Sequence, residues 1–240
     1  MNSVGIIGYG RFGKVLANIL QKGFAVKVYD LKTQDSSPDV DFCSLDDVLK
    51  ESSIFIAVPI RSFKDVIASI APKLINHTTI LDVCSVKKYP VGIMEKFLPK
   101  ETGIIATHPM FGPDSFLQSN RLNIMMHSTR DTNNVYSFWK NYFSGQDLKV
   151  IEIDPDTHDK LASHTQGVTH YLGRTLRSFG IKKTQIDTQG FRDLLDLVDQ
   201  TCNDTMELFL DLQNYNPYTK NMIKNLDAAF NQIADKLENK

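Results

Sequence analysis

The chain of 240 residues is long enough for one large domain or two modest ones, and a hydrophobic fraction of 42% can fill a core. The net charge of −1, without a long basic block, gives no indication of binding to nucleic acid or to an anionic membrane surface. No apolar stretch is long enough to span a bilayer, the start lacks a signal peptide, and the three cysteines have neither a disulfide pattern nor metal-ligand spacing. We therefore expect a cytoplasmic protein without a metal site.

A glycine-rich turn follows the first apolar run, residues 4–7, and leads into a stretch whose apolar residues have helical spacing. This order of strand, G-x-G-x-x-G turn and helix is required of a dinucleotide-binding unit, and the alternative is a glycine turn that binds no ligand. Gly8 permits the tight turn, Gly10 leaves room for a pyrophosphate, and Gly13 lets the helix approach the strand. Backbone N–H groups at the helix start would face the phosphates, where the helix dipole also favours negative charge. The predicted phosphate-binding residues are Gly8, Gly10, Arg11, Phe12 and Gly13.

A second strand is predicted at residues 25–29, and it ends at Asp30, about 20 residues after the first glycine of the turn. A carboxylate in this place can accept hydrogen bonds from both hydroxyls of the adenosine ribose and would repel a 2′-phosphate. We therefore expect NAD as the cofactor. NADP stays possible, because the ammonium group of Lys32 could reach a 2′-phosphate.

Beyond a polar stretch at residues 32–41, which is typical of a loop, strand-like apolar runs alternate with helical patterns. Such alternation is typical of a doubly wound, mostly parallel sheet, so residues 1–153 are predicted to form a Rossmann-type, NAD-binding α/β domain. The strand-like runs lie at residues 54–58, 79–83, 103–107, 122–127 and 150–153, and the helical patterns at residues 45–50, 62–70, 91–98 and 133–143.

Several residues stand where an expected strand ends. They are Gly8, Pro59, Ser85 and His108. Because doubly wound sheets bind ligands beyond the carboxyl ends of their strands, we expect these residues to converge on one crevice. Val58 and Pro59, which end the third strand-like run, are expected to bind the cofactor there.

From residue 154 onward the pattern changes to long helical periodicity without strand-like runs. One helix is predicted at residues 154–179 and is ended by Gly180. Two more helices are predicted at residues 189–214 and 218–237. Because a small all-helical domain, residues 154–240, cannot easily bury its apolar stripes alone, we expect it to pair with a second copy as a homodimer.

Three motifs in the chain carry a resemblance to a known family. They are the segments 82–87 (DVCSVK) and 108–113 (HPMFGP), and the pair His158-Asp159 with Gln166 and His170 behind it. In these motifs the chain resembles the prephenate and arogenate dehydrogenases of tyrosine biosynthesis, and the resemblance covers nearly the whole chain. Residues 197–204, followed by Tyr215-Asn216, look more like the plant-type arogenate enzymes than the common bacterial prephenate enzymes.

The resemblance implies an oxidative decarboxylation of a cyclohexadiene that carries a ring carboxylate at C1 and a hydroxyl at C4. A hydride leaves C4 for the nicotinamide, the hydroxyl loses its proton, CO₂ departs and the ring becomes aromatic. His108 is the candidate proton acceptor, because a neutral imidazole has one free acceptor nitrogen near physiological pH; the alternative is a histidine that stabilises a turn. Ser85 would orient His108 or the substrate hydroxyl, whereas Lys87 is expected to form a structural ion pair.

Gln166, His170 and Arg174 follow one another at steps of four and therefore share one face of the predicted helix. A polar stripe is often a solvated face, but the resemblance places Gln166 and His170 toward the substrate. Arg174 is a further candidate, because a guanidinium binds a carboxylate bidentately. Bacterial prephenate enzymes bind the ring carboxylate with an arginine of the following helix, where this chain has Asp196, so the cation stays open between Arg174 and Arg192.

Asp204 is the candidate selector between the two substrates. Arogenate carries an ammonium group where prephenate carries a keto oxygen, and a carboxylate near that position would attract the ammonium. Asp204 lies in the segment that most resembles the arogenate enzymes, so we expect arogenate to be preferred, with prephenate close behind. The alternative is a solvated helix aspartate.

Two other functions stay open at this point. A β-hydroxyacid-type dehydrogenase also joins a Rossmann domain to a helical domain, but it would be expected to use a lysine of the helical domain and would not explain HPMFGP. A non-catalytic, NAD-sensing protein would bind the cofactor and turn over no substrate.

Overall fold

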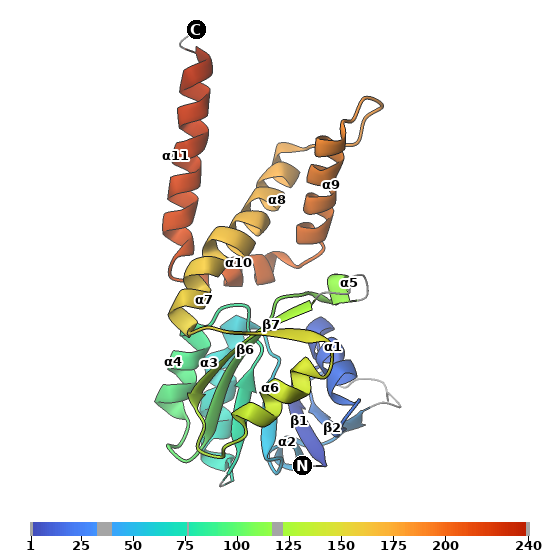
Figure 1. The fold of residues 1–240 in the computed structure, drawn as a ribbon, viewed down its shortest axis with the longest axis vertical. Coiled ribbons are helices and arrows are strands. Elements are labelled where there is room, and N and C mark those ends of the chain that lie inside the picture. The colour runs from blue at the N-terminus through green and yellow to red at the C-terminus, as the bar shows by residue number, and fades with distance from the viewer. Residues whose placement is uncertain (1, 33–39, 76, 117–121, 239–240) are drawn as a thin grey trace. The chain divides into compact units, whose positions relative to one another are not determined.

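In a computed structural model that describes residues 2–32, 40–75, 77–116 and 122–238, the chain divides into two compact units, Met1–His158 and Asp159–Lys240. Figure 1 follows the chain through both units. Most of the loop expected at residues 32–41 lies outside the described residues. No helix in the described part of the chain is long and apolar enough to cross a membrane.

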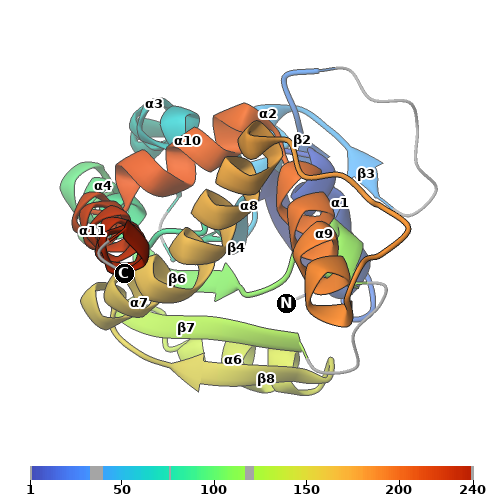
Figure 2. The ribbon, with the colours of Figure 1, turned by 90° about the horizontal axis from the view of Figure 1, so that it is seen from above.

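The first unit is built on a sheet whose strand order, in the described residues, is β3-β2-β1-β4-β5-β6-β7-β8. Neighbouring strands are parallel except β6 and β7, so the predicted doubly wound, mostly parallel sheet is confirmed. The strands are β1 (Ser3–Ile7), β2 (Ala25–Tyr29), β3 (Asp41–Phe42), β4 (Ser53–Ile56), β5 (Thr79–Asp82), β6 (Gly103–Pro109), β7 (Leu122–Arg130) and β8 (Leu148–Glu152). Figure 2 shows β7 and β8 side by side at one margin of the sheet.

Helices cover both faces of this sheet, as the alternating pattern predicts. Helices α1 and α6 pack on one face, and α3 and α4 pack against each other on the opposite face (Figure 1). The helices of this unit are α1 (Arg11–Leu20), α2 (Leu45–Val48), α3 (Ile60–Ile70), a 3₁₀ turn (Ala71–Lys73), α4 (Lys88–Phe97), α5 (Pro113–Phe116) and α6 (Tyr136–Ser144). The short strand β3 and the short helix α5 were not predicted, because each is too brief to show a periodicity.

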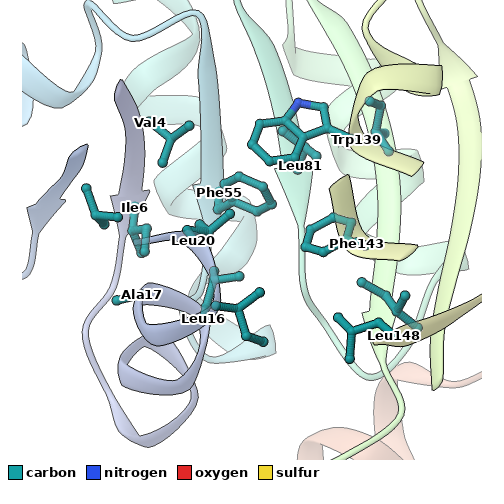
Figure 3. Close-up of a cluster of buried hydrophobic side chains, with 14 of the residues drawn as sticks. Val4, Ile6, Leu16, Ala17, Leu20, Phe55, Leu81, Trp139, Phe143 and Leu148 are labelled. Atoms are coloured by element: carbon teal, nitrogen blue, oxygen red, sulfur yellow. The ribbon is translucent and has the colours of Figure 1, made fainter. Parts of the chain in front are cut away.

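The main core of the first unit lies between the sheet and helices α1 and α6 (Figure 3). Phe55 of β4 and Leu81 of β5 point into this core, while Ile54, the neighbour of Phe55, points to the other face by strand alternation. Trp139 of α6 is fully buried, with its ring centroid 4.9 Å from that of Phe55. Its indole N–H donates a hydrogen bond to the hydroxyl of Ser53 over 3.2 Å, so the polar atom of this large side chain is satisfied.

Strand β6 is longer than predicted, because its carboxyl end pairs with the antiparallel strand β7. His108 lies inside this extension, opposite Met125, rather than in a loop beyond the strand. The backbone of His108 is therefore held in a ladder of strand hydrogen bonds, which is a more rigid support than a loop provides.

The segment predicted as one helix at residues 154–179 is helical from Pro155 to Phe179, but it is not a regular α-helix throughout. It consists of α7 (Pro155–Ala162), which runs across the boundary between the units, a π-helical turn (Ser163–Gly167) and α8 (Val168–Phe179). The carbonyl of Gly167, the last residue of the π-helical turn, accepts a hydrogen bond from the side-chain amide of Gln213 over 3.1 Å. The predicted end is confirmed, because Gly180 adopts the left-handed conformation, with φ 88°, that caps α8.

The prediction of a single helix at residues 189–214 is wrong, because this segment forms two helices, α9 (Gln189–Cys202) and α10 (Met206–Tyr215). The hydroxyl of Thr205 accepts a hydrogen bond from the N–H of Leu208 over 3.2 Å and so begins a new helix. Asp204 therefore lies in the turn between two helices. The last helix of the second unit is α11 (Thr219–Glu238).

Candidate functional site

The glycine turn between β1 and α1 has the geometry that its sequence indicates. Gly8 has φ +101°, and a Cβ on it would lie 2.4 Å from the carbonyl oxygen of Ala57. A Cβ on Gly13 would lie 2.3 Å from the carbonyl oxygen of Gly8, so only glycine lets α1 approach the strand this closely. A Cβ on Gly10 would meet no atom within 4 Å, because this residue faces an open cavity.

That cavity, of about 790 Å³, lies within the first unit at the carboxyl ends of β1, β2 and β4. In the strand order, β1 stands between β2 and β4, which is the switch point where doubly wound sheets bind ligands. The predicted cofactor-binding residues that line the cavity are Gly8, Gly10, Arg11, Asp30, Val58 and Pro59. Phe12 and Gly13 are not among its described lining residues, since the ring of Phe12 packs near Phe111 and Gly13 faces the strand.

Asp30 is held at the end of β2 by two backbone N–H groups. One of its oxygens accepts a hydrogen bond from the N–H of Tyr9 over 2.6 Å, and the other accepts one from the N–H of Lys32 over 2.8 Å. A carboxylate has about four lone-pair sites, so acceptor capacity is left for the hydroxyls of a ligand in the cavity.

Arg11, the first residue of α1, forms an exposed ion pair with Asp114 of α5, with its Nη2 2.9 Å from Oδ2 of that carboxylate. Phe12 follows Arg11 in the chain, and the centroid of its aromatic ring lies 6.1 Å from that of Phe111. These two contacts tie the segment that follows the HPM motif to the start of α1.

A buried ion pair joins the carboxyl ends of β5 and β6. The ammonium group of Lys87 donates hydrogen bonds to Asp82 at the end of β5 and to the carbonyl oxygen of Thr107 in β6. Neither charged side chain is exposed to solvent. Burial raises the pKa of the Asp82 carboxyl, and Lys87 and the N–H of Cys84 act against that rise. The ion pair expected for Lys87 is therefore present, and it is fully buried.

His108, which follows Thr107, is 2% exposed and pairs with a second histidine. Its Nδ1 lies 2.8 Å from Nε2 of His158, a residue of α7 that is also 2% exposed. Burial, followed by the proximity of His158 and of Lys87, holds the pKa of His108 well below its ordinary value of 6.5. The imidazole of His108 is therefore neutral at neutral pH and retains one further ring nitrogen for a reaction.

Of the two roles predicted for Ser85, orienting His108 is not seen, because the two make no hydrogen bond in the described structure and His158 is the partner of His108. Orienting the substrate hydroxyl stays a prediction. Ser85 is partly exposed beyond β5, which leaves its hydroxyl for another group. The sequence does not reveal the pairing of His108 with His158, because 50 positions separate the two histidines. The recognised His158-Asp159 motif was the one signal that could have drawn attention to it.

In the second unit, three of the predicted substrate-binding residues lie close together: His170, Arg174 and Asp204. The guanidinium of Arg174 donates to the carbonyl oxygen of Asp204, and its centre lies 5.6 Å from the ring of Phe209. Burial lowers the pKa of His170, the carboxylate of Asp204 acts in the opposite direction, and Arg174 lowers that pKa further. Among the described residues, Nε of Arg174 and Nδ1 of His170 are buried without a hydrogen-bond partner, so both could bind a polar ligand.

The structure does not bring all predicted residues to this cluster. Gln166 is partly exposed in the π-helical turn and, within the described residues, forms no hydrogen bond with His170 or Arg174. Arg192 is exposed near the start of α9, where it donates to the carbonyl oxygen of Asp187 over 2.6 Å. The sequence leaves two arginines, Arg174 and Arg192, as candidates for binding the ring carboxylate. Of these, Arg174 is the one that lies in a partly buried polar cluster.

Comparison with known protein families places both parts of the chain. A model described as prephenate dehydrogenase, nucleotide-binding domain, matches residues 15–168, and one described as TYRAAT1-like, C-terminal domain, matches residues 175–240. Arogenate dehydrogenase 2, chloroplastic, from Arabidopsis thaliana is 30% identical, over 98% of this chain and 69% of the relative. Arogenate dehydrogenase 1, chloroplastic, from the same plant is 30% identical over 98% of this chain and only 39% of the relative. The chain thus spans from two fifths to about two thirds of their lengths.

A solved structure of A. aeolicus prephenate dehydrogenase, in complex with hydroxyphenyl propionate and NAD⁺, has the same fold. Its TM-score is 0.75 with 18% sequence identity, over 99% of this chain and 91% of that one. The two plant relatives are named as chloroplastic, so the cytoplasmic compartment expected for this chain stays a prediction.

The buried ion pair leads to a stability prediction. Lys87→Met should lower the free energy of unfolding by about 3–5 kcal/mol, because it leaves the charge of Asp82 buried and unpaired. The neighbouring Lys88 forms an exposed pair with Asp156, so Lys88→Met should cost less than about 1 kcal/mol. Equilibrium urea unfolding measures both. Adding Asp82→Asn to Lys87→Met should recover part of the loss, and equal losses for the two lysine variants would contradict the prediction.

Proposed function

Because the chain belongs to the prephenate and arogenate dehydrogenase family, we propose that it catalyses the NAD-dependent oxidative decarboxylation of arogenate, prephenate or both, in tyrosine biosynthesis. The observation that carries the proposal is the neutral, buried imidazole of His108 at the same sheet edge as the cavity beyond β1 and β4. We assign cofactor binding to residues 1–153, and substrate binding and dimerisation to residues 154–240.

The cavity fits a dinucleotide. Gly10 has free space where a side chain would otherwise project, and it precedes the first turn of α1, whose N–H groups can bind phosphate. Asp30 can accept hydrogen bonds from ribose hydroxyls, and Val58 and Pro59 supply apolar lining. When bound, NAD accepts the hydride from the substrate carbon that carries the hydroxyl.

His108 moves the proton in this reaction. Its free ring nitrogen accepts the proton of the substrate hydroxyl as the carbon–hydrogen bond of that carbon is oxidised. The bond to the ring carboxylate then breaks, CO₂ leaves, and the electron pair makes the ring aromatic. The phenolic oxygen takes the proton back from His108, so the residue is regenerated. Ser85, at the end of the adjacent strand, supplies a hydroxyl that can hold the same oxygen.

Residues of the second unit are assigned to the charged and polar groups of the substrate. The unpaired Nε–H of Arg174 and the unpaired Nδ1 of His170 suit a carboxylate and a further polar group. Gln166 is assigned a supporting amide contact. A purified protein that reduces neither NAD⁺ nor NADP⁺ with either substrate would refute the enzyme proposal and leave the NAD-sensing alternative.

Replacing His108 by Asn should lower kcat by roughly 10²- to 10⁴-fold, with a smaller effect on KM, because a positioned proton acceptor is lost. The low pKa of His108 also predicts the pH dependence. Since the neutral form is the active one, kcat should stay level from neutral pH down past the ordinary histidine range and fall only at more acidic pH. Steady-state assays across pH check both statements, and a near-native kcat in the variant would contradict the role.

The cofactor preference should be NAD⁺ over NADP⁺, because the carboxylate of Asp30 would repel a 2′-phosphate. Asp30→Asn keeps an oxygen for a backbone N–H and removes the charge, and Asp30→Ser also shortens the side chain. Each should narrow the ratio of kcat/KM for the two cofactors by about tenfold, equivalent to about 1.4 kcal/mol. Equal or better turnover of the unmutated protein with NADP⁺ would contradict the assignment.

Asp204 is proposed to select arogenate. Burial lowers the pKa of His170 and the carboxylate of Asp204 acts against that lowering, so the charge of Asp204 is felt within the cluster of the second unit. An opposite-charge contact with the ammonium of arogenate could contribute ~1–3 kcal/mol, or one to two decades in specificity. Asp204→Asn should therefore shift kcat/KM toward prephenate. If the ratio of kcat/KM for arogenate and prephenate stayed unchanged in the variant, or if the unmutated protein preferred prephenate, Asp204 would not be the residue that selects the substrate.

We also propose that the second unit forms a homodimer. Phe230, Ile233 and Leu237 share one face of α11 and are 51%, 58% and 72% exposed. An apolar face of this kind on a helix is stable in water only when another surface covers it. Sedimentation equilibrium at micromolar concentration should give twice the monomer mass, and Ile233→Asp should shift the protein toward monomer. A monomeric native protein would disprove the dimer.

A further inference from the structure

The pair of buried histidines contains a feature that the proton-acceptor role alone does not explain. Nδ1 of His108 and Nε2 of His158 are 2.8 Å apart, which is hydrogen-bond distance, and their rings lie at 72° to each other. Only one hydrogen can occupy the space between two ring nitrogens. One ring must therefore donate and the other accept, and this choice determines the tautomer of both rings.

The two arrangements have opposite consequences for a reaction at the remaining nitrogen of His108. If His158 donates, Nδ1 of His108 is the acceptor, and Nε2 of His108 carries the hydrogen and cannot take up another proton. If His108 donates, its Nε2 has a free lone pair. Only the second arrangement makes His108 a proton acceptor.

We propose that His158 is a positioning residue that accepts the Nδ1–H hydrogen bond of His108 and so keeps Nε2 of His108 as the proton acceptor. The inference rests on the proposed function and assigns its proton transfer to one atom. The hydrogen of the substrate hydroxyl forms a bond to Nε2 as its bond to oxygen breaks. The resulting imidazolium keeps its Nδ1–H bonded to His158 until Nε2 returns the proton to the phenolic oxygen.

The surroundings determine why a histidine, and not a carboxylate, suits this chemistry. Lys87, on the segment between β5 and α4, lies close enough to act on His108, and its charge is paired with that of Asp82 of β5. A carboxylate partner would stabilise the imidazolium and hold the proton, whereas His158 orients the ring without adding negative charge. His108 therefore releases the proton readily when the product ring becomes aromatic.

Two substitutions separate positioning from mere packing. In His158→Gln, the side-chain oxygen can accept a hydrogen bond near the place of Nε2, whereas His158→Leu fills much of the volume and cannot accept one. We expect kcat to fall about 10- to 100-fold in His158→Leu with little change in KM, and to be largely restored in His158→Gln. Equal losses in the two variants, or none in either, would overturn the positioning role.

The tautomer of His108 can be determined by NMR spectroscopy, without measuring catalytic activity. In protein labelled with ¹⁵N-histidine, two-bond ¹H–¹⁵N correlation spectra should show His108 protonated at Nδ1 and bare at Nε2. The signals are assigned by loss in His108→Asn. In His158→Leu the Nε2-protonated form of His108 should appear, and a native protein already protonated at Nε2 would overturn the inference even if His158→Leu failed to fold.

His77 provides the matched control. It precedes β5 at the amino end of the strand, opposite to Asp82, and has φ 69°, which asparagine tolerates well. His77→Asn should leave kcat and the His108 signals unchanged. An inactive native protein with the expected His108 tautomer would refute the proposed function alone, whereas an active protein with the opposite tautomer would refute this inference alone.

Discussion

The ammonium group of Lys87 lies without solvent contact between the carboxyl ends of two parallel strands, and the edge of the sheet that carries His108 depends on how it is held. Asp82 compensates its charge, and the carbonyl of Thr107 accepts a further hydrogen bond. Removing a charge from water is expensive, so this arrangement is stable only when all its partners stay in place. These hydrogen bonds hold the carboxyl ends of β5 and β6 together. His108 directly follows Thr107, the residue of β6 whose carbonyl oxygen binds Lys87.

The ammonium group of Lys87 also acts electrostatically on His108. Burial among the strands, the nearby His158 and the buried positive charge of Lys87 each disfavour the protonated form of His108. The structural ion pair and the proposed proton acceptor are thus coupled through position. A substitution at Lys87 would act on the stability of the sheet and on the pKa of His108 together, and pH profiles are needed to distinguish the two.

The dinucleotide cavity could be predicted in detail because its requirements are local. A strand, a turn and a helix within the first twenty residues place Gly8, Gly10 and Gly13, and the close contacts at Gly8 and Gly13 leave no room for any other side chain. Asp30 follows from strand periodicity. Phe12 was assigned to the cavity by its place in the motif, yet its ring packs near Phe111, which lies far away in the sequence.

Hydrophobic periodicity, glycine spacing and the recognised motifs were therefore enough to determine the fold class and the family and to place the cofactor cavity, whereas the role of His108 stays a prediction. Tertiary contacts decided what periodicity cannot encode. A π-helical turn at Ser163–Gly167 interrupts the regular helix that the sequence predicts, and the side-chain amide of Gln213 donates a hydrogen bond to the carbonyl of Gly167 there. His158 reaches His108 across 50 positions, because a partner on another element is set by packing and not by spacing.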